Sequence, residues 1–431
     1  MTRRAPYLLL LLALAMVFTG CNGEEPSPFA DDATAFVGAT LWDGTGWGPI
    51  ENAALVVQNG RVETTIDLDE QALPEGLNTV DLSGQYVIPG LINAHGHVGI
   101  ADGLNTGPEV HSEENVRDQL RLYAQYGVTT VVSLGDEPEE AFAVRDAMEA
   151  DNPKKARVRL AGPVLDPDTE DEAREQVAQL AERDPDWAKI RVDDFLGQAE
   201  KMPESVYAAV IEAAHEHDLP LAAHIVELED AKGVLEHNAD LIAHSVRDEP
   251  VDDALIALMD EGDVCFTPTL TREVSTYTYA ERPDFFDDPF FRAHADEDVL
   301  DQLQEPEVQE QYTGEAADYY REALPLAKDN MVELHEAGVD IAMGTDSGPP
   351  ARFQGYFEHK EMAMMQDAGL NPVTILESAT RVSADCMGLD RVGTLDLGHW
   401  ADFLVLDANP LEDIENLRGI EAVYLAGERF E

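Results

Sequence analysis

Two histidines close an apolar segment of this chain at a spacing typical of metal ligands. His95 and His97 follow the run 87–92, with Gly96 between them. In a β-strand, residues i and i+2 point to the same face, so both imidazoles would share one side. Neutral imidazole is a common metal ligand. Alone the triplet is a weak signal, because such histidines more often belong to the surface or the core. It predicts half a metal site that other segments must complete.

Further side chains that could complete the site stand at the ends of other strand-like segments. They are Lys189, His224, His244 and Asp346. Lys189 and Arg191 alternate with two apolar residues, which predicts that both cations face one side of a strand. A lysine inside a barrel is costly unless it is paired or chemically modified. This set of residues, taken together, predicts a metal centre.

Each of these residues also has an ordinary explanation when it is considered singly. A lone histidine such as His224 or His244 is often a hydrogen-bonded core residue. Asp346, in the segment Gly-Thr-Asp-Ser-Gly, could be a helix N-cap or a turn residue. His359 lies close enough after Asp346 in the sequence to have a role near the site, but a histidine on the surface of a helix needs no such role. The coincidence at several strand ends favours the metal centre.

The elements that must position these residues alternate between strand and helix along the middle of the chain. The strand-like segments are 91–97, 128–134, 157–164, 188–193, 221–225, 241–246, 263–270 and 340–345, and amphipathic helices include 114–126, 205–217 and 253–260. This alternation predicts parallel βα units. No glycine-rich dinucleotide loop follows the first strand, which favours a closed (β/α)8 TIM barrel over an open sheet. Barrel active sites lie at the carboxyl ends of the strands.

Short strands and turns flank this region on both sides. Asn59-Gly60 predicts a type I′ hairpin turn. Neither flank is large enough to hold a core alone, so we expect one small composite β-sandwich domain made from both. The expected organisation is a signal peptide at 1–20, a tether at 21–35, the first part of the sandwich at 36–88, the hydrolase barrel at 89–390 and the second part of the sandwich at 391–431.

The first residues of the chain have the pattern of an export signal. Arg3-Arg4 precede an apolar run that is shorter than the about 20 residues needed to span a bilayer as a helix. The segment Phe-Thr-Gly-Cys ending at Cys21 resembles a bacterial lipobox, with Phe18 where leucine is usual. We expect a lipoprotein lipidated at Cys21 and held at the cell envelope, on its periplasmic or extracellular face.

The chain is extremely acidic, with 87 Asp and Glu against 28 Lys and Arg and a formal net charge of −59. Such a field excludes nucleic acid and anionic membrane surfaces as partners, apart from a lipid anchor. Because the charge is spread along the chain, we expect a solvated surface adapted to high salt, where the Debye length falls to about 3 Å. The sequence leaves a homo-oligomer open. Cys265 and Cys386 lie in apolar contexts and are expected to be buried free thiols.

The segment after the seventh strand, about 271–315, is too long for an ordinary connection. It is rich in aromatic side chains, at Tyr277, Tyr279, Phe285, Phe286, Phe290 and Phe291. Long loops in a compact domain are usually functional lids or disordered insertions. The aromatic content favours a packed lid.

With these motifs in place, the chain resembles the amidohydrolase superfamily, in its imidazolonepropionase-like and metal-dependent carboxypeptidase (prolidase-like) branch. The matching segments are 87–97, 188–192, 221–225, 242–246, 344–348 and 393–402. The chain departs from the family pattern in Gly96, where a bulkier residue is common, and in His399-Trp400, which replaces lysine-tryptophan. Neither departure affects the ligand set.

The resemblance implies two divalent metal ions, zinc by expectation, in the barrel mouth. His95, His97 and Asp346 would hold the more buried ion, and His224 and His244 the more exposed one. Lys189 would be carbamylated and bridge both ions. Such a pair lowers the pKa of a bridging water to about 7, so hydroxide can attack the carbonyl. Asp346 would take up the proton and pass it to the leaving amine.

The implied reaction is hydrolysis of the C–N amide bond of a dipeptide or N-acyl amino acid, a small-molecule substrate. The candidates to bind its carboxylate are Arg191, which lies two residues beyond Lys189 on the same strand face, and Arg247 and Arg272, which follow the sixth and seventh strands. Arg191 could instead pair with Asp193 or another internal acid. Alternatives on the same barrel are a cyclic-amide, lactone or ester hydrolase and a mononuclear deaminase. Deaminases that resemble this chain lack the lysine at position 189. A non-catalytic binding lipoprotein is the alternative from another class.

Overall fold

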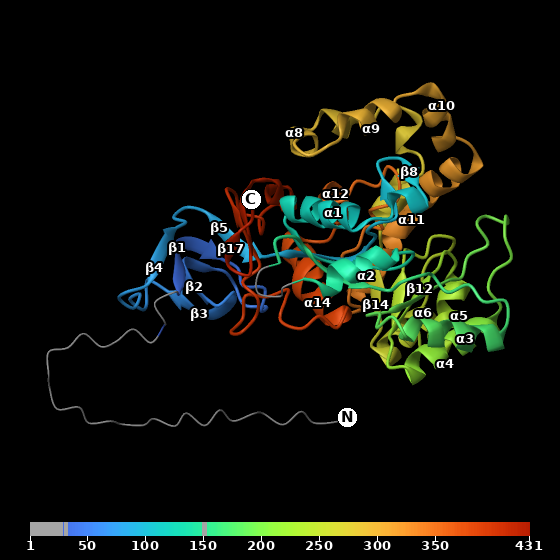
Figure 1. Ribbon diagram of the computed structural model, residues 1–431, viewed down its shortest axis with the longest axis horizontal. Helices are drawn as coiled ribbons and strands as arrows, with labels where there is room; N and C mark the ends of the chain where they lie inside the picture. Colours follow the sequence, from blue (N-terminus) through green and yellow to red (C-terminus); the bar gives the residue numbers. More distant parts are fainter. Residues whose placement is uncertain (1–28, 30–32, 149–152) are drawn as a thin grey trace.

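The computed structural model describes residues 29, 33–148 and 153–431. The protein has an α/β fold in which one mixed sheet lies beside a region of parallel strands and helices (Figure 1). No helix in these described ranges combines the length and the apolar character needed to cross a bilayer. The predicted signal peptide and the lipidation site Cys21 lie outside the described residues.

The flanking strands from both ends of the chain belong to one sheet, with the order β17-β16-β15-β5-β1-β2-β3, and β4 pairs with β1. The strands are β1 (Thr34–Leu41), β2 (Ile50–Gln58), β3 (Arg61–Asp67), β4 (Asn78–Asp81), β5 (Tyr86–Pro89), β15 (Phe403–Leu406), β16 (Ile420–Leu425) and β17 (Glu428–Arg429). The Asn59-Gly60 hairpin between β2 and β3 is confirmed, and both residues have the positive φ that a type I′ turn requires. Strand β1 begins inside the predicted tether. The sandwich and the domain boundaries stay predictions.

The strands that carry the histidines are parallel and form two sheets. One contains β10 (Arg157–Leu160), β9 (Val128–Ser133) and β6 (Leu91–Gly96), and the other contains β11 (Ala188–Arg191), β12 (Leu221–His224), β13 (Leu241–Ala243) and β14 (Cys265–Thr267). Their interior residues are almost all buried, as the apolar runs predicted.

The eighth predicted strand is not a regular strand in the described part of the chain. Ile341 forms only an isolated bridge to Phe266. The segment still lies between β14 and β6, because the Ala342 amide donates to the Phe266 carbonyl at 2.9 Å and the Ala94 amide donates to the Met343 carbonyl at 2.8 Å. The seam between β10 and β11 is held by the Leu165 amide, 2.8 Å from the Lys189 carbonyl oxygen. The described strands therefore do not make one continuous closed sheet, contrary to expectation.

Helices follow the parallel strands in the predicted order. They are α1 (Glu113–Gln125), α2 (Glu139–Asp146), α3 (Glu170–Ala181), α4 (Glu204–Glu216), α5 (Leu228–Glu236), α6 (Asp253–Gly262), α11 (Glu315–Glu336), α12 (Tyr356–Ala368), α13 (Pro372–Glu377) and α14 (Ser383–Cys386). Ser112 caps α1 and Asp252 caps α6 through their side chains, which fixes where these helices begin.

The long segment after β14 folds as a helical cover. It contains α7 (Leu270–Ser275), α8 (Pro289–Arg292), α9 (Glu297–Gln302) and α10 (Pro306–Gln309), joined by short 3-10 turns. Helices α8 to α10 lie along one edge of the molecule (Figure 1). Tyr279, Phe286 and Phe291 are buried together with Tyr356 and Phe357 of α12. The segment is therefore packed, as its aromatic content predicted.

The expectation of free thiols at Cys265 and Cys386 is wrong. The two cysteines form a disulfide between β14 and α14, with their Cα atoms 5.8 Å apart. They are separated by 121 positions in the chain. Such a pairing depends on how distant segments meet in space, so their spacing gave no indication of it.

Candidate active site

The predicted ligands of the more buried ion lie together at one end of the parallel strands. His95 lies in β6, His97 directly follows it, and Asp346 follows the segment beside β14. One ligand atom from each of these three buried residues lies within 4.8 Å of the others. The Nε2 atom of His97 is 2.8 Å from Oδ1 of Asp346, and the Nε2 atom of His95 is 3.8 Å from the same oxygen.

The two histidines predicted for the second ion lie beside this group. His224 ends β12 and His244 directly follows β13. The ring centroids of His224 and His244 are 4.3 Å apart, and those of His244 and His95 are 4.8 Å apart. The structure thus brings all four imidazoles into one cluster.

In three of the four imidazoles, a hydrogen bond occupies one ring nitrogen and orients the ring. Nδ1 of His97 donates to the Gly135 carbonyl at 2.8 Å, and Nε2 of His224 is 3.1 Å from Oδ2 of Asp193. Nδ1 of His244 is 2.7 Å from the hydroxyl oxygen of Thr269. Such partners orient metal-binding histidines and select their tautomer.

Lys189 lies in β11 and is 3% exposed. Among the described residues its Nζ atom has no hydrogen-bond partner, and the same holds for Nδ1 of His95. A buried polar group without a partner is costly, so its presence requires an explanation. Both atoms lie in the cluster that the sequence predicted as a metal centre.

Burial sets the protonation states of these groups. It lowers the pKa of Lys189 to about 7, against the opposing charge of Asp346. Burial also lowers the pKa of His224 to about 3 and that of His95 and His244 well below their usual value. Three imidazoles are therefore neutral at pH 7, which is the form that binds a metal.

His97 and Asp346 are influenced by each other. Burial disfavours the charged imidazole, but the hydrogen bond to Asp346, the charges of Asp346 and Glu137 and the bond to the Gly135 carbonyl together raise the pKa of His97. Burial likewise opposes ionisation of Asp346, but Arg352 and His97 hold the pKa of its carboxyl well below the usual range. The site keeps one buried carboxylate ionised next to neutral imidazoles.

Several residues of the site have strained backbones. Asp346, His244 and Thr269 have φ values of 56°, 73° and 49°, in the left-handed region. Non-glycine residues in this region cost about 1–3 kcal/mol each and tend to cluster at functional sites. The prediction of a turn at Asp346 is consistent with this conformation, but its carboxylate points to His97 and Arg352 and does not cap a helix.

The three predicted substrate-binding arginines differ in position. Arg247 is buried and Arg272 half-buried, and their guanidinium groups lie 3.2 Å and 3.1 Å from the carboxylate of Glu273. Two guanidinium groups thus share one buried carboxylate. Arg191 is partly exposed, and its Nη2 atom lies 3.9 Å from Oδ2 of Asp136, which is an exposed carboxylate and not an internal one. Arg272 lies close enough to add to the lowering of the pKa of His224, of which burial is the main cause.

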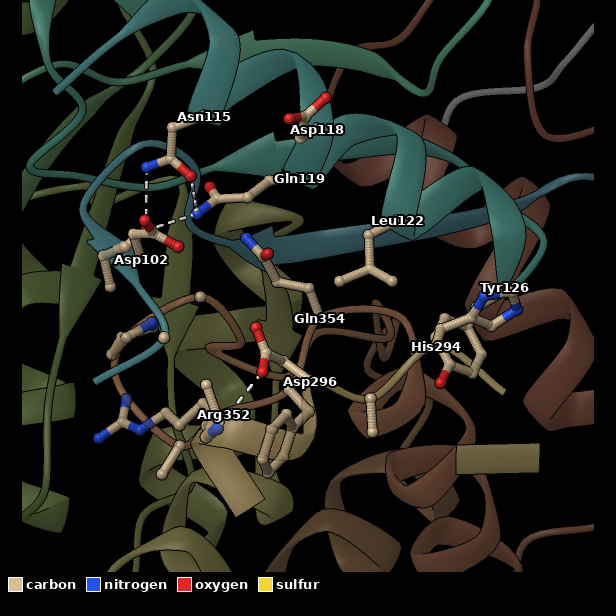
Figure 2. A pocket seen from close by; sticks show the side chains of 18 of the residues that line it. Asp102, Asn115, Asp118, Gln119, Leu122, Tyr126, His294, Asp296, Arg352 and Gln354 are labelled. Atoms are coloured by element: carbon tan, nitrogen blue, oxygen red, sulfur yellow. Dashed lines mark hydrogen bonds between the residues drawn. The ribbon is translucent and has the colours of Figure 1, made fainter. Parts of the chain in front are cut away.

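Sequence reasoning missed Arg352, which hydrogen-bonds Oδ2 of Asp346 and, through Nε, the Ser275 hydroxyl at 3.1 Å. It lies in an irregular segment after Asp346, where no spacing rule applies. Arg352 also lines a cavity of about 240 Å³ between α1, the helical cover and the segment 348–354 (Figure 2). In that view its guanidinium points away from the cavity, and Gln354 of the same wall donates to the His97 carbonyl at 2.8 Å.

His359, whose role the sequence did not decide, is buried in α12 and lies outside the metal cluster. Its Nε2 atom donates to the Tyr126 carbonyl at 2.8 Å, and its ring packs edge-on against Phe290 at 4.8 Å. The residue therefore joins α12 to the helical cover.

Comparison with known proteins agrees with this geometry. The family model described as the amidohydrolase family matches residues 86–429. The chain belongs to the amidohydrolase family. An uncharacterized protein of Mycobacterium tuberculosis is 26% identical over 364 residues, which cover 82% of this chain and 88% of that protein.

Solved structures of similar shape include prolidase-like amidohydrolases. A candidate prolidase from Bifidobacterium longum has a TM-score of 0.73 and 26% identity, covering 92% of this amidohydrolase and 94% of that chain. A Xaa-Pro dipeptidase with bound methionine in its active site has a TM-score of 0.75 and 21% identity, covering 93% and 100%. The family and these neighbours make this chain a hydrolase, and enzymes of this kind act on small molecules.

Proposed function

We propose that this amidohydrolase cleaves the C–N amide bond of a dipeptide or N-acyl amino acid at a centre for two divalent ions. The observation that carries the proposal is Lys189, a buried amine without a hydrogen-bond partner in the described chain, beside four imidazoles and the Asp346 carboxylate. We also propose that the two parallel sheets and the segment 340–345 together make the (β/α)8 barrel. The bridges at both seams support this.

The residues present fit a pair of divalent ions, for which zinc is the first choice. His95, His97 and Asp346 would hold one ion, and His224 and His244 the other. Neutral imidazole and carboxylate are ligands that zinc accepts. Bound ions would lower the pKa of a water molecule to about 7 and polarise the carbonyl of the substrate.

Lys189 would become a ligand by reacting with carbon dioxide. The neutral amine is the form that adds carbon dioxide, and a pKa of about 7 provides it at neutral pH. The new N–C bond forms as the amine loses a proton to solvent, and the carbamate would offer two oxygens as ligands for the two cations. The deaminase alternative does not use such a lysine.

Asp346 would move the proton in this reaction. Its carboxylate is ionised and oriented by His97 on one oxygen and Arg352 on the other. It can accept the proton of the attacking water and deliver it to the departing amine.

Arg272 is the candidate to bind the carboxylate of the substrate. It lies at the start of α7, and it shares Glu273 with Arg247, so this buried group carries one positive charge more than negative. An anionic substrate group would balance that charge. Arg247 is held by the Ser245 carbonyl at 2.6 Å and so is placed to support Arg272.

We propose that the protein is exported and held at the envelope through lipid on Cys21. The Cys265–Cys386 disulfide supports an oxidising compartment. The net charge of −59 supports adaptation to high salt. Greatest stability and activity in low-salt buffer would contradict this adaptation.

The test is a screen of the purified protein, loaded with zinc in molar salt, against dipeptides, N-acyl amino acids, lactones and cyclic amides. Amine release from the first two classes supports the proposal, as would two zinc equivalents per chain. Selective hydrolysis of lactones or cyclic amides would redirect it to those substrates. A protein that binds no metal and hydrolyses none of them would contradict it.

A further inference from the structure

A buried carboxylate in the first turn of α12 joins the two segments that carry His95 and Asp346. Glu358 is fully buried, and its Oε1 atom accepts hydrogen bonds from Asn93 Nδ2 at 2.6 Å, the Thr345 hydroxyl at 2.7 Å and the Ser347 hydroxyl at 2.6 Å. Its Oε2 atom has no hydrogen-bond partner in the described part of the chain. One oxygen atom therefore collects three buried donors.

The three donors adjoin predicted metal ligands. Thr345 and Ser347 are the residues on either side of Asp346. Asn93 lies two residues before His95, and its Oδ1 atom accepts the His95 amide at 2.9 Å. Glu358 thus contacts none of the ligands itself but fixes the residues next to them.

The Asp346 segment needs such a restraint. Asp346 has a φ of 56°, a conformation that persists in a non-glycine residue only where the surroundings impose it. The amides of Thr345 and Asp346 both donate to the His95 carbonyl, at 3.1 Å and 2.7 Å. A change in the conformation of either segment would therefore move ligands in both.

We propose that Glu358 is a positioning residue that holds Asp346 and His95 in the geometry required to bind the first metal ion. This inference rests on the proposed function, because it assumes that these residues bind a metal. Direct hydrogen-bond partners of ligands typically change metal affinity or activity by 10–100-fold when they are removed. Glu358 acts one residue further from the metal, so we expect the lower end of this range.

Glu361, one turn further along α12, provides a matched control. It is also fully buried, and its carboxylate accepts the amides of Leu270 and Thr271, both at 2.7 Å. It anchors the start of α7, and the Thr271 hydroxyl, 2.7 Å from its Oε2 atom, also lies 3.1 Å from the Thr345 carbonyl, so the segment 91–98 is the one that distinguishes the two glutamates. Replacement of either glutamate by leucine removes one buried carboxyl group from the same helix.

The experiment compares Glu358→Leu, Glu358→Gln and Glu361→Leu by hydrogen exchange of the metal-free protein and by zinc affinity in competition with a chelator. Glu358→Leu should speed amide exchange over 91–98 and 343–348 and weaken zinc binding by about 10-fold. Glu358→Gln keeps an oxygen acceptor without the charge, so its effects should be smaller. Glu361→Leu should speed exchange over 268–275 and leave 91–98 as in the wild type.

Wild-type exchange and zinc affinity in both Glu358 variants would overturn the inference. Equal changes over 91–98 in Glu361→Leu would also overturn it, because the effect would then be general loosening of the fold. A wild type that binds zinc but hydrolyses no amide, with the expected exchange pattern in the variants, would contradict the proposed function and still support the role of Glu358.

Discussion

The guanidinium of Arg352 donates a hydrogen bond to Oδ2 of Asp346, while Nε2 of His97 lies 2.8 Å from Oδ1 of the same carboxylate. The two partners come from different segments and approach the carboxylate from opposite oxygens. Together they keep Asp346 ionised in spite of its burial.

We expect Asp346→Asn to lower turnover by about 100-fold or more, because the amide cannot accept the proton of the attacking water. Asparagine keeps one oxygen for a metal, so much of the metal should remain bound. Steady-state kinetics and metal analysis of the same preparation check both statements. Turnover close to that of the wild type would remove Asp346 from the chemistry.

We expect Lys189→Arg to lower the metal content from two equivalents to about one and to abolish most activity. Arginine stays cationic and forms no carbamate, so no ligand would bridge the two ions. Metal analysis after dialysis measures the change. The control is Lys360→Arg. Lys360 lies in α12, outside the metal cluster, and its Nζ atom is 4.7 Å from the centroid of the Phe285 ring. Equal metal content in both variants would contradict a bridging role for Lys189.

Local patterns sufficed for much of the fold. The apolar runs ending at His97 and His224 predicted buried strands, and the periodicity of 114–126 predicted a helix within one residue of α1. Each of these signals depends on neighbouring residues along the chain. The prediction of an eighth strand at 340–345 was wrong. Ile341 forms only an isolated bridge to Phe266, and the backbone turns at Asp346, which leaves too few paired residues for a regular strand.

The parts of the site that the sequence did not predict depend on contacts between distant segments. Arg352 and Glu358 do not lie at a sequence spacing typical of any motif. Their roles become visible only in the folded structure, where Arg352 contacts Asp346 and Glu358 contacts Asn93. The Cys265–Cys386 disulfide likewise depends on two segments that are distant in the sequence and meet only in the fold. Metal-ligand candidates could be predicted because their residue types are rare and stand at strand ends, whereas an arginine or glutamate in an acidic chain carries no such signal.

We expect the double variant Cys265→Ser, Cys386→Ser to unfold at lower denaturant concentration. The bond closes a loop of 121 positions, for which the chain-entropy model gives about 4–5 kcal/mol, less any relaxation of the folded state. Denaturant unfolding in molar salt, with and without reductant, measures the difference. The wild type in reductant should approach the variant, and the variant should not respond to reductant. Identical midpoints in all four measurements would contradict a disulfide in the folded protein.

The contact between α12 and the helical cover should be sensitive to acid through His359. Burial lowers the pKa of this imidazole to about 4, below its ordinary value of 6.5. The unfolded chain therefore takes up the proton first as the pH falls. The contribution of His359 to stability is complete above about pH 6.5 and is lost between there and pH 4, amounting to about 3 kcal/mol.

His359→Gln tests this contribution, because glutamine can still donate to the Tyr126 carbonyl but does not titrate. We expect the free energy of unfolding of the wild type to fall more steeply from pH 7 to pH 4 than that of the variant, by up to about 3 kcal/mol over the range. His217→Gln, at an exposed position after α4, is the control and should follow the wild type. Parallel pH profiles for the wild type and His359→Gln would show that the buried imidazole does not govern the acid sensitivity of this contact.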